Sequence, residues 1–195
     1  DDITLFAGFN GPHVAPGDYS ARFTSGKDQQ TVSFQVKMDP RISATDEEIQ
    51  FWSERLAEVE GLLNESLESL ENLRRAGRQI EALRRDYPDD SGLQETAAAA
   101  MEQIAAWDGK IIQVLHQTYE DEDAWETMLV GQLRYLMDVI DHTGAPVTGG
   151  ALLRLEDLRA EWGMREAELQ GIKTEYVDVI NDWAKEKGVP YVSAP

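Results

Sequence analysis

Residues that could bind a metal ion occur as two pairs with helical spacing. His116 and Glu120 are four positions apart, as are Asp138 and His142, so each pair would share one face of a helix. Neither pair has the third nearby ligand that a zinc site needs. Because the chain contains 37 Asp and Glu residues, such pairs are expected by coincidence. We interpret both as solvated pairs near helix ends, where His favours the C-terminal dipole.

Two acidic segments could attract a cation such as calcium. Residues 120–123 read Glu-Asp-Glu-Asp, and residues 86–90 read Asp-Tyr-Pro-Asp-Asp. Both lack the alternating ligands and the central glycine of a calcium-binding loop. We therefore interpret both as solvated turns next to helix starts.

The chain contains no motif typical of catalysis. It has neither the Gly-x-Ser-x-Gly turn of a serine hydrolase nor a phosphate-binding glycine loop before a helix, and Gly149-Gly150 is interpreted as a turn. A carboxylate pair for glycoside hydrolysis needs a cleft that raises one pKa, whereas most Glu residues fall between apolar positions on outer helical faces. Cysteine is absent, which excludes disulfides and thiol chemistry. The sequence predicts no catalytic, cofactor-binding or metal-binding residue.

Tryptophan could mark a sugar platform or a cofactor site, and the chain has five. All five fall on or beside periodic apolar stripes, which predicts core packing for Trp52, Trp107, Trp125, Trp162 and Trp183. Asn64-Glu65-Ser66 matches the N-glycosylation motif. It lies inside a predicted helix, so we do not expect modification there.

Net charge restricts the partners. Lys and Arg total 18 against 37 Asp and Glu, a net charge of −19, which argues against nucleic acid and anionic membranes as partners. No apolar run approaches the roughly 18–20 residues of a membrane span. The charge is uneven, because residues 1–44 carry −1 and residues 45–195 carry −18. The start at Asp1, with neither Met nor a signal peptide, predicts a mature product or a fragment.

Residues 1–41 are predicted to form a small antiparallel β segment. Short or alternating apolar runs occupy residues 3–6, 19–23 and 31–38, with turn residues between them. Three or four strands are too few for an immunoglobulin-like sandwich, which needs about seven. The segment is therefore half of a sandwich or a sheet packed on the helices. We favour a partial immunoglobulin- or fibronectin-like sandwich.

Residues 42–195 are predicted to form an acidic, antiparallel four-helix bundle, so the fold class is α+β and mainly α. Apolar stripes with three- and four-residue spacing cover residues 49–87, 93–114, 125–140 and 151–183. The last stripe comprises Ala151, Leu155, Leu158, Trp162, Leu169, Ile172, Tyr176, Val179 and Trp183. First and last helices of roughly 40 residues would each span about 60 Å. Their ends should then project past the shorter helices as a two-stranded coiled coil.

Several segments together resemble a known family. They are residues 13–23, Gly26-Lys27, residues 36–41 with Asp39-Pro40-Arg41, residues 129–133, residues 144–148 and residues 187–192. The pattern is similar to the C-terminal region of bacterial sortilin/VPS10-like BNR-repeat β-propeller proteins, which are often labelled glycosyl hydrolases. The propeller repeats of that family are absent here, so none of their residues is carried over. The resemblance implies an exported protein, periplasmic or extracellular.

These observations favour a non-catalytic C-terminal module of an exported β-propeller protein, mediating packing or protein–protein contacts. Its expected partner is a β-propeller domain, a neighbouring subunit or another copy of the chain. One alternative is a part of a glycan-active hydrolase that contributes to a carbohydrate site. Another is a free-standing adaptor that binds a peptide strand at the open sheet edge.

Overall fold

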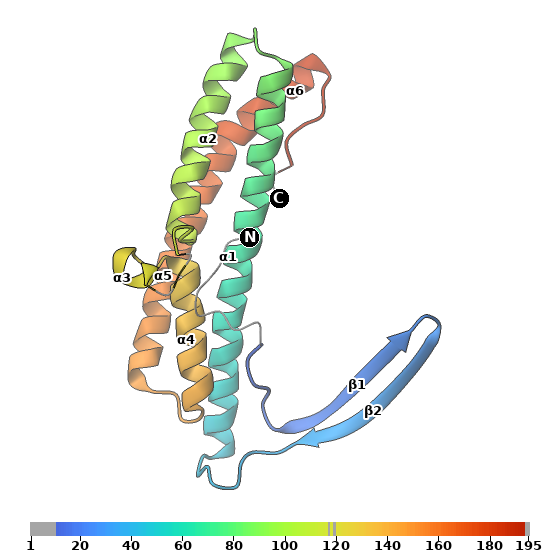
Figure 1. Ribbon diagram of the computed structural model, residues 1–195, viewed down its shortest axis with the longest axis vertical. Coiled ribbons are helices and arrows are strands. Elements are labelled where there is room, and N and C mark those ends of the chain that lie inside the picture. Colours follow the sequence, from blue (N-terminus) through green and yellow to red (C-terminus); the bar gives the residue numbers. More distant parts are fainter. Residues whose placement is uncertain (1–10, 117, 119, 194–195) are drawn as a thin grey trace.

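The computed structural model describes residues 11–116, 118 and 120–193. In this part of the chain the protein consists of a β-hairpin and a long helical bundle, so the mainly helical α+β class is confirmed. The hairpin extends away from one end of the bundle, and its tip lies far from the helices (Figure 1). No helix among these residues is both long and apolar enough to cross a membrane.

The hairpin consists of β1 (Gly17–Ser25) and β2 (Asp28–Val36), which pair in antiparallel orientation. Gly26 has a φ of 61°, as the first central position of a type II′ turn requires, and glycine adopts that conformation without strain. The described part of the sheet thus has two strands rather than the three or four expected. The predicted run at residues 3–6 lies outside the described residues.

Helix α1 (Asp46–Asp86) has 41 residues and starts at a capping box. The Thr45 hydroxyl accepts a hydrogen bond from the Glu48 main-chain N–H, and the Glu48 carboxylate accepts one from the Thr45 N–H. This reciprocal pair satisfies two donors that a helix start leaves unpaired. The helix ends before Pro88, which cannot continue it.

The other helices are α2 (Ser91–Ile111), the short α3 (Asp121–Ala124), α4 (Leu129–Thr143), α5 (Gly149–Ile172) and α6 (Asp178–Lys187). One π-helical turn, η1 (Lys173–Val177), joins α5 to α6 without a break. Side chains cap two helix starts, because Asp90 accepts from the Leu93 N–H and Thr148 accepts from the Ala151 N–H.

The helices form three rods rather than four. We use rod for a helix, or consecutive helices, running the length of the bundle. α1 is the first rod, α2 followed by α4 is the second, and α5, η1 and α6 form the third (Figure 1). Four long helices are present, as predicted, but the expected side-by-side arrangement of all four, with the ends of the first and last projecting as a coiled coil, is not the one observed. The connection between α2 and α4 does not reverse the chain, so α2 covers one half of α1 and α4 covers the other.

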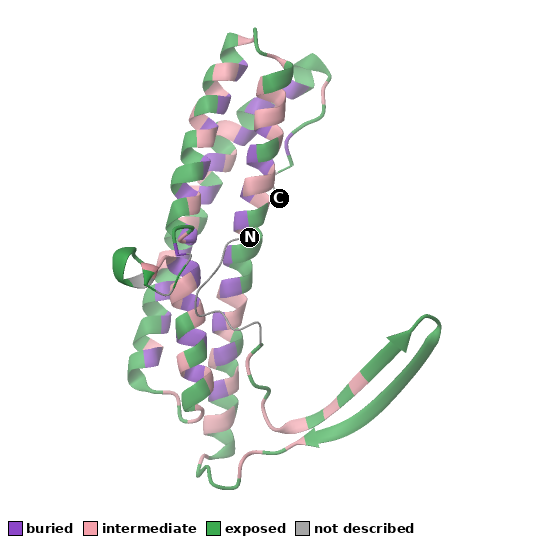
Figure 2. Ribbon diagram, in the orientation of Figure 1, coloured by how far each residue is buried: buried purple, intermediate pink, exposed green. Residues whose placement is uncertain are grey.

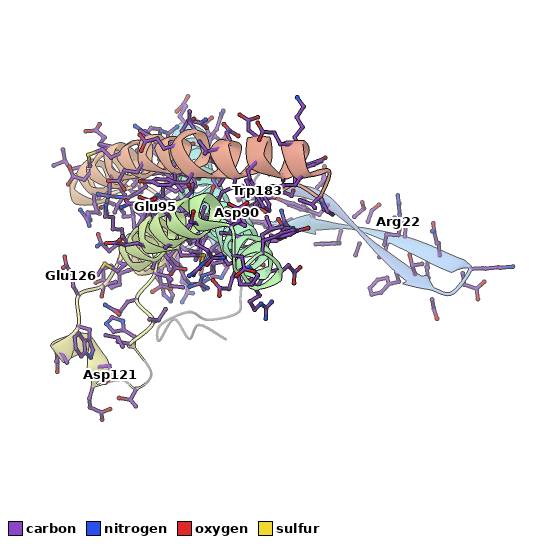
Figure 3. All side chains as sticks on the ribbon, turned by 90° about the horizontal axis from the view of Figure 1, so that it is seen from above. Arg22, Asp90, Glu95, Asp121, Glu126 and Trp183 are labelled. Carbon is purple, nitrogen blue, oxygen red and sulfur yellow. The ribbon has the colours of Figure 1, made fainter. Side chains whose placement is uncertain are left out.

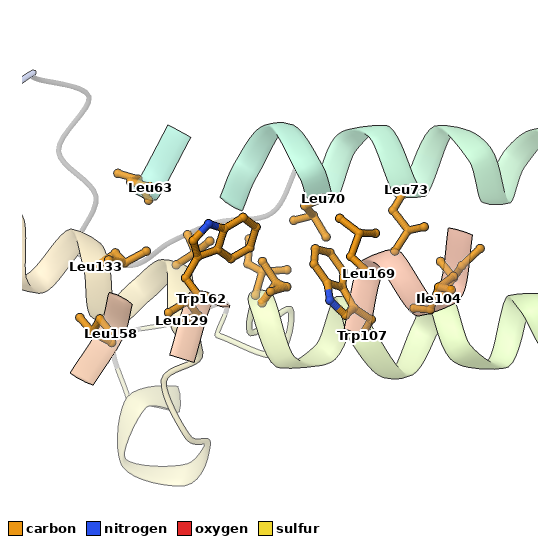
Figure 4. Close-up of a cluster of buried hydrophobic side chains, with 14 of the residues drawn as sticks. Leu63, Leu70, Leu73, Ile104, Trp107, Leu129, Leu133, Leu158, Trp162 and Leu169 are labelled. Carbon is orange, nitrogen blue, oxygen red and sulfur yellow. The ribbon is translucent and has the colours of Figure 1, made fainter. Parts of the chain in front are cut away.

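Buried apolar side chains from all three rods form one continuous core along the bundle (Figure 2). Trp107 and Trp162 lie in it among leucines from several helices (Figure 4). Two indole N–H groups also donate across helix interfaces, from Trp52 to the Ile140 oxygen at 2.9 Å and from Trp107 to the Arg165 oxygen at 2.8 Å. These tryptophans therefore join neighbouring rods by packing and by hydrogen bonds.

Two predicted core positions are wrong for the same reason. Trp125 and Val114 are 48% and 49% exposed, because both lie in the connection between α2 and α4. The helix that should have included Trp125 begins only at Leu129, and α2 ends at Ile111. Ile112 at the start of this connection still packs in the core, whereas Val114, Leu115 and Trp125 further along it are exposed.

The π turn changes which residues of the third rod are buried. After Ile172 the next buried positions are Val177, Ile180 and Ala184, whereas Val179 is 48% exposed. Ile172 and Val177 are five residues apart, a spacing that an uninterrupted α-helix would place on different faces. The wider turn absorbs one extra residue and returns the apolar stripe to the core. The prediction of Val179 as a core residue is therefore wrong.

Candidate functional site: the β-hairpin surface

The predicted metal pairs separate in the structure. His116 follows the end of α2, is 7% exposed, and its Nε2 donates to the Trp125 main-chain oxygen at 2.8 Å. Glu120 precedes α3, so the two residues do not share a helix face. The expected solvated setting is wrong for His116, whereas Glu120 is exposed. Asp138 and His142 do form an exposed pair near the end of α4, at 3.1 Å. No cluster of three metal-binding side chains occurs among the described residues.

The two acidic segments act as turns and caps. The Asp121 carboxylate accepts from the Thr118 N–H at 2.7 Å at the start of α3. Asp90 caps α2 and accepts from the Trp183 indole N–H at 3.0 Å, with Lys187 at 3.2 Å. The Leu93 N–H, then the Trp183 N–H and Lys187, hold the pKa of Asp90 below its usual value. This carboxylate therefore joins α2 to α6 in its ionised form.

A pocket of about 280 Å³ lies where α2 ends and α4 begins against α1. Its lining comprises Leu67, Leu70, Glu71, Arg74, Ile112, Val130 and Arg134. Arg74 pairs with Asp108 and joins α1 to α2, whereas Glu71 pairs with Arg78 within α1. The lining includes one carboxylate, whereas glycoside hydrolysis usually needs two. This pocket does not supply the acidic pair that the hydrolase alternative requires.

The predicted glycosylation motif lies within α1, as expected. The Ser66 side chain is fully buried and its hydroxyl donates to the Leu62 main-chain oxygen at 2.7 Å. The hydroxyl that the motif contributes is thus already used inside the helix.

The hairpin has one apolar face and one polar face. In the antiparallel register Tyr19 is opposite Phe34 and Ala21 is opposite Val32, so residues that directly face each other lie on the same side. We call the apolar side the hairpin face; it comprises Tyr19, Ala21, Phe23, Val32, Phe34 and Val36. The opposite side carries Asp18, Ser20, Arg22, Thr24, Gln29, Thr31, Ser33 and Gln35. The alternation in both strands predicted these two sides.

The hairpin face is uncovered in the described part of the chain. Phe23, Phe34 and Val32 are 65%, 49% and 47% exposed. Exposure rises toward the tip, which extends away from all helices (Figures 2 and 3). The alternation of apolar and polar residues predicts that this side of the hairpin is buried, yet in the structure it contacts solvent.

Two interactions fix the base of the hairpin. The His13 main-chain N–H and ring Nδ1 contact the Asp141 carboxylate at 3.1 and 2.8 Å, joining the chain before β1 to the end of α4. The Tyr19 hydroxyl donates to the Ala15 main-chain oxygen at 2.7 Å, and its ring stacks on Phe34 with centroids 6.1 Å apart. The hairpin is thus held at its base and open along its length.

Sequence reasoning missed the contact between His13 and Asp141. The two residues are 128 positions apart, so no local pattern connects them. The Tyr19 hydrogen bond spans four residues around Pro16-Gly17, and that turn followed by a tyrosine could have indicated it.

Charge separates this surface from the rest of the protein. β1, β2 and their turn contain Asp18 and Asp28 against Arg22 and Lys27, so their formal charge is zero. The whole chain carries −19. A partner can therefore approach the hairpin face by apolar contact, without the repulsion that the bundle would exert on an acidic protein.

No protein-family description, no curated protein and no solved structure matches this chain.

Proposed function

We propose that the chain is a non-catalytic assembly module whose β-hairpin packs against a β-rich domain, with the helical bundle as a rigid acidic support. The resemblance of its turns and helical tail suggests that this domain belongs to an exported β-propeller protein of the sortilin-like type. The module would then act outside the cytoplasm, in the periplasm or beyond the cell.

The exposed hairpin face is the observation that carries this proposal. A two-stranded hairpin without a covering layer is only marginally stable in water, and full burial of a Phe or Val side chain contributes about 1.5–3 kcal/mol. Phe23, Val32 and Phe34 leave about half or more of their surface exposed. Covering them with a second apolar layer would stabilise both the hairpin and the complex.

The bundle supports the same role. Its apolar residues pack against one another, Trp52 and Trp107 join the rods, and none of its described acidic residues is buried. Such a scaffold holds a projecting element in place and resists non-specific association through its net charge.

The test is a binding measurement with the β-propeller portion encoded by the same reading frame, purified separately. Phe23→Thr with Val32→Thr removes apolar surface while keeping residues that favour strands. We expect at least a tenfold loss of affinity by calorimetry, which corresponds to about 1.4 kcal/mol. The matched control is Gln29→Thr with Ser33→Thr on the polar side, which should bind like the original chain.

Equal binding by the two double variants would show that the hairpin face is not the contact surface. A reading frame that encodes no propeller would refute the assignment to the sortilin-like proteins. Hydrolysis of a glycan by the purified chain, lost when an acidic pair is neutralised, would favour the hydrolase alternative.

A further inference from the structure

The hydrogen bond of Tyr19 has a counterpart in a known type of β-sandwich. Tyr19 is the third residue of β1, and its hydroxyl bonds to the main chain four residues upstream. Immunoglobulin-type sandwiches have the same arrangement at the start of strand F, the so-called tyrosine corner, and strand G follows F through a hairpin. By this correspondence β1 takes the place of strand F and β2 that of strand G.

The chain after β2 agrees with this assignment. Strand G is the last strand of such a sandwich, and here the chain leaves the hairpin at Val36 and enters α1 at Asp46. Between them, Asp39 and Arg41 form a local ion pair at 2.5 Å that shapes the turn into the helix.

The strand order of the sandwich then distinguishes the two edges of the hairpin. Strand F lies between strands C and G, so the outer edge of β1 should pair with another strand. In the part of the chain that the structure describes, no strand pairs with that edge or with the outer edge of β2. The hairpin face would meanwhile pack on the opposing sheet, at the spacing of about 10 Å that stacked sheets adopt.

A second copy of the chain is a poorer occupant of the hairpin face. The exposed surface of Phe23, Phe34 and Val32 amounts to roughly 300 Å². Each partner in a stable complex buries about 800 Å² of its surface, so this area is too small for a dimer formed through the hairpin face. Each copy also carries −19, so two copies repel each other. A neutral hairpin on an acidic chain is better suited to a different, β-rich surface.

We infer that the β-rich remainder of the protein adds an antiparallel strand along the outer edge of β1 and lays a second sheet over the hairpin face, so that β1 and β2 complete an immunoglobulin-like sandwich. This inference rests on the proposed function and adds the edge, the strand order and the type of partner domain. According to this inference β1 is an interior strand of the sheet, with β2 on one side and the added strand on the other. β2 is then the edge strand and needs no further strand on its outer side.

Ser20 and Ser33 provide a matched pair of positions for the test, because they face each other in the register. The pair flanking the two-residue turn is hydrogen-bonded, and pairs alternate along an antiparallel ladder. Ser25 and Asp28 flank the turn, so Ser20 and Ser33, five pairs further along, form a pair that is not hydrogen-bonded to each other. Their N–H groups therefore point away from the hairpin, Ser20 on the outer edge of β1 and Ser33 on the outer edge of β2. Proline at either position therefore removes one outward donor and no bond within the hairpin.

The experiment compares Ser20→Pro with Ser33→Pro in the complete polypeptide of the reading frame, using hydrogen exchange. In the unsubstituted polypeptide, outward amides of β1 should exchange at least about 100-fold more slowly than in the 195-residue chain by itself. Ser20→Pro should abolish this protection, whereas Ser33→Pro should keep it. The ring contact of Tyr19 with Phe34, followed by NMR in the isolated chain, shows whether each variant retains the hairpin.

The inference would be overturned if the outward amides of β1 stayed protected from exchange in Ser20→Pro. It would also be overturned if Ser33→Pro, and not Ser20→Pro, abolished that protection. In either case the proposed function stands if Phe23→Thr with Val32→Thr still weakens binding. Failure of that double variant as well would reject both. Tyr19→Phe provides a further check: it should speed the exchange of β1 amides about tenfold or more in the complete polypeptide and leave bundle amides unchanged.

Discussion

The bundle and the hairpin both obey simple apolar periodicities, yet they use their apolar side chains in opposite ways. In the bundle the three- and four-residue spacing ends in a continuous core, with Trp107 only 1% exposed. In the hairpin the two-residue spacing produces an equally ordered face, with Phe23 65% exposed. The bundle therefore supplies its own packing partners, whereas the hairpin face finds none among the residues that the structure describes.

The largest expected effect separates these two regions directly. Trp107→Ala should lower the free energy of unfolding of the bundle by about 3–5 kcal/mol, because it leaves a cavity and removes the hydrogen bond to the Arg165 oxygen. Phe23→Ala should change it by less than about 0.5 kcal/mol, because the side chain already contacts solvent. Urea denaturation followed by far-ultraviolet circular dichroism measures both. Similar losses for the two variants would contradict the contrast.

A smaller effect tests the contrast within one rod. Val177→Ala should cost about 1–2 kcal/mol, since its side chain is 2% exposed behind the π turn. Val179→Ala, at 48% exposure, should cost less than about 0.5 kcal/mol. Chemical denaturation of the two variants in parallel is the measurement. The reverse order would mean that the third rod continues as an uninterrupted α-helix.

The smallest effect concerns two carboxylates whose pKa values are lowered by different surroundings. Asp90 is held by the Leu93 N–H, Trp183 and Lys187 from two helices, whereas Asp39 is held mainly by Arg41, two residues away. A lowered pKa stabilises the fold fully above the ordinary value of 3.8, and this stabilisation is lost as the pH falls from 3.8 through the folded-state value. Protonation of Asp90 should therefore weaken the bundle. Asp39 pairs with Arg41 only two residues away, a contact that the unfolded chain can also form, so protonation of Asp39 should change the free energy of unfolding much less.

Asp90→Asn separates these effects, because Asn caps a helix as well as Asp does but does not titrate. Thermal unfolding measured from neutral pH to below 3.8 should show a shallower decline for Asp90→Asn than for the original chain. Asp39→Asn is the control and should follow the original profile. Identical profiles for all three proteins would show that Asp90 does not join α2 and α6 through its charge.

Much of the local structure could be predicted from the sequence. Apolar spacing and turn residues predict the four long helical segments and the turn at Gly26. They also predict which side of residues 19–23 and of residues 31–38 is apolar, and the two sides coincide in the observed strand register. The start of α1 follows from Thr45 and the acids after it. Each of these features depends on residues a few positions apart, which is why the sequence alone reveals them.

The errors occurred where distant residues decide the outcome. The predicted stripe from Ala151 to Trp183 fitted an ideal helix, whereas the structure has a π turn at residues 173–177 that packs against α2. Trp125 looked like the first residue of a helical stripe, but the α2–α4 connection carries it away from the core. For the candidate site, both strands and their apolar side were predictable, whereas the contact between His13 and Asp141 was not.

Amino-acid order by itself determined which segments become helix or strand, which side of each is apolar, and where most helices start and stop, since these properties arise from neighbouring residues. Tertiary structure alone decided that α2 and α4 share one rod, that the third rod shifts register, and that the described residues leave the hairpin face uncovered. Those outcomes depend on which surfaces can meet in space, and periodicity along the chain does not contain that information.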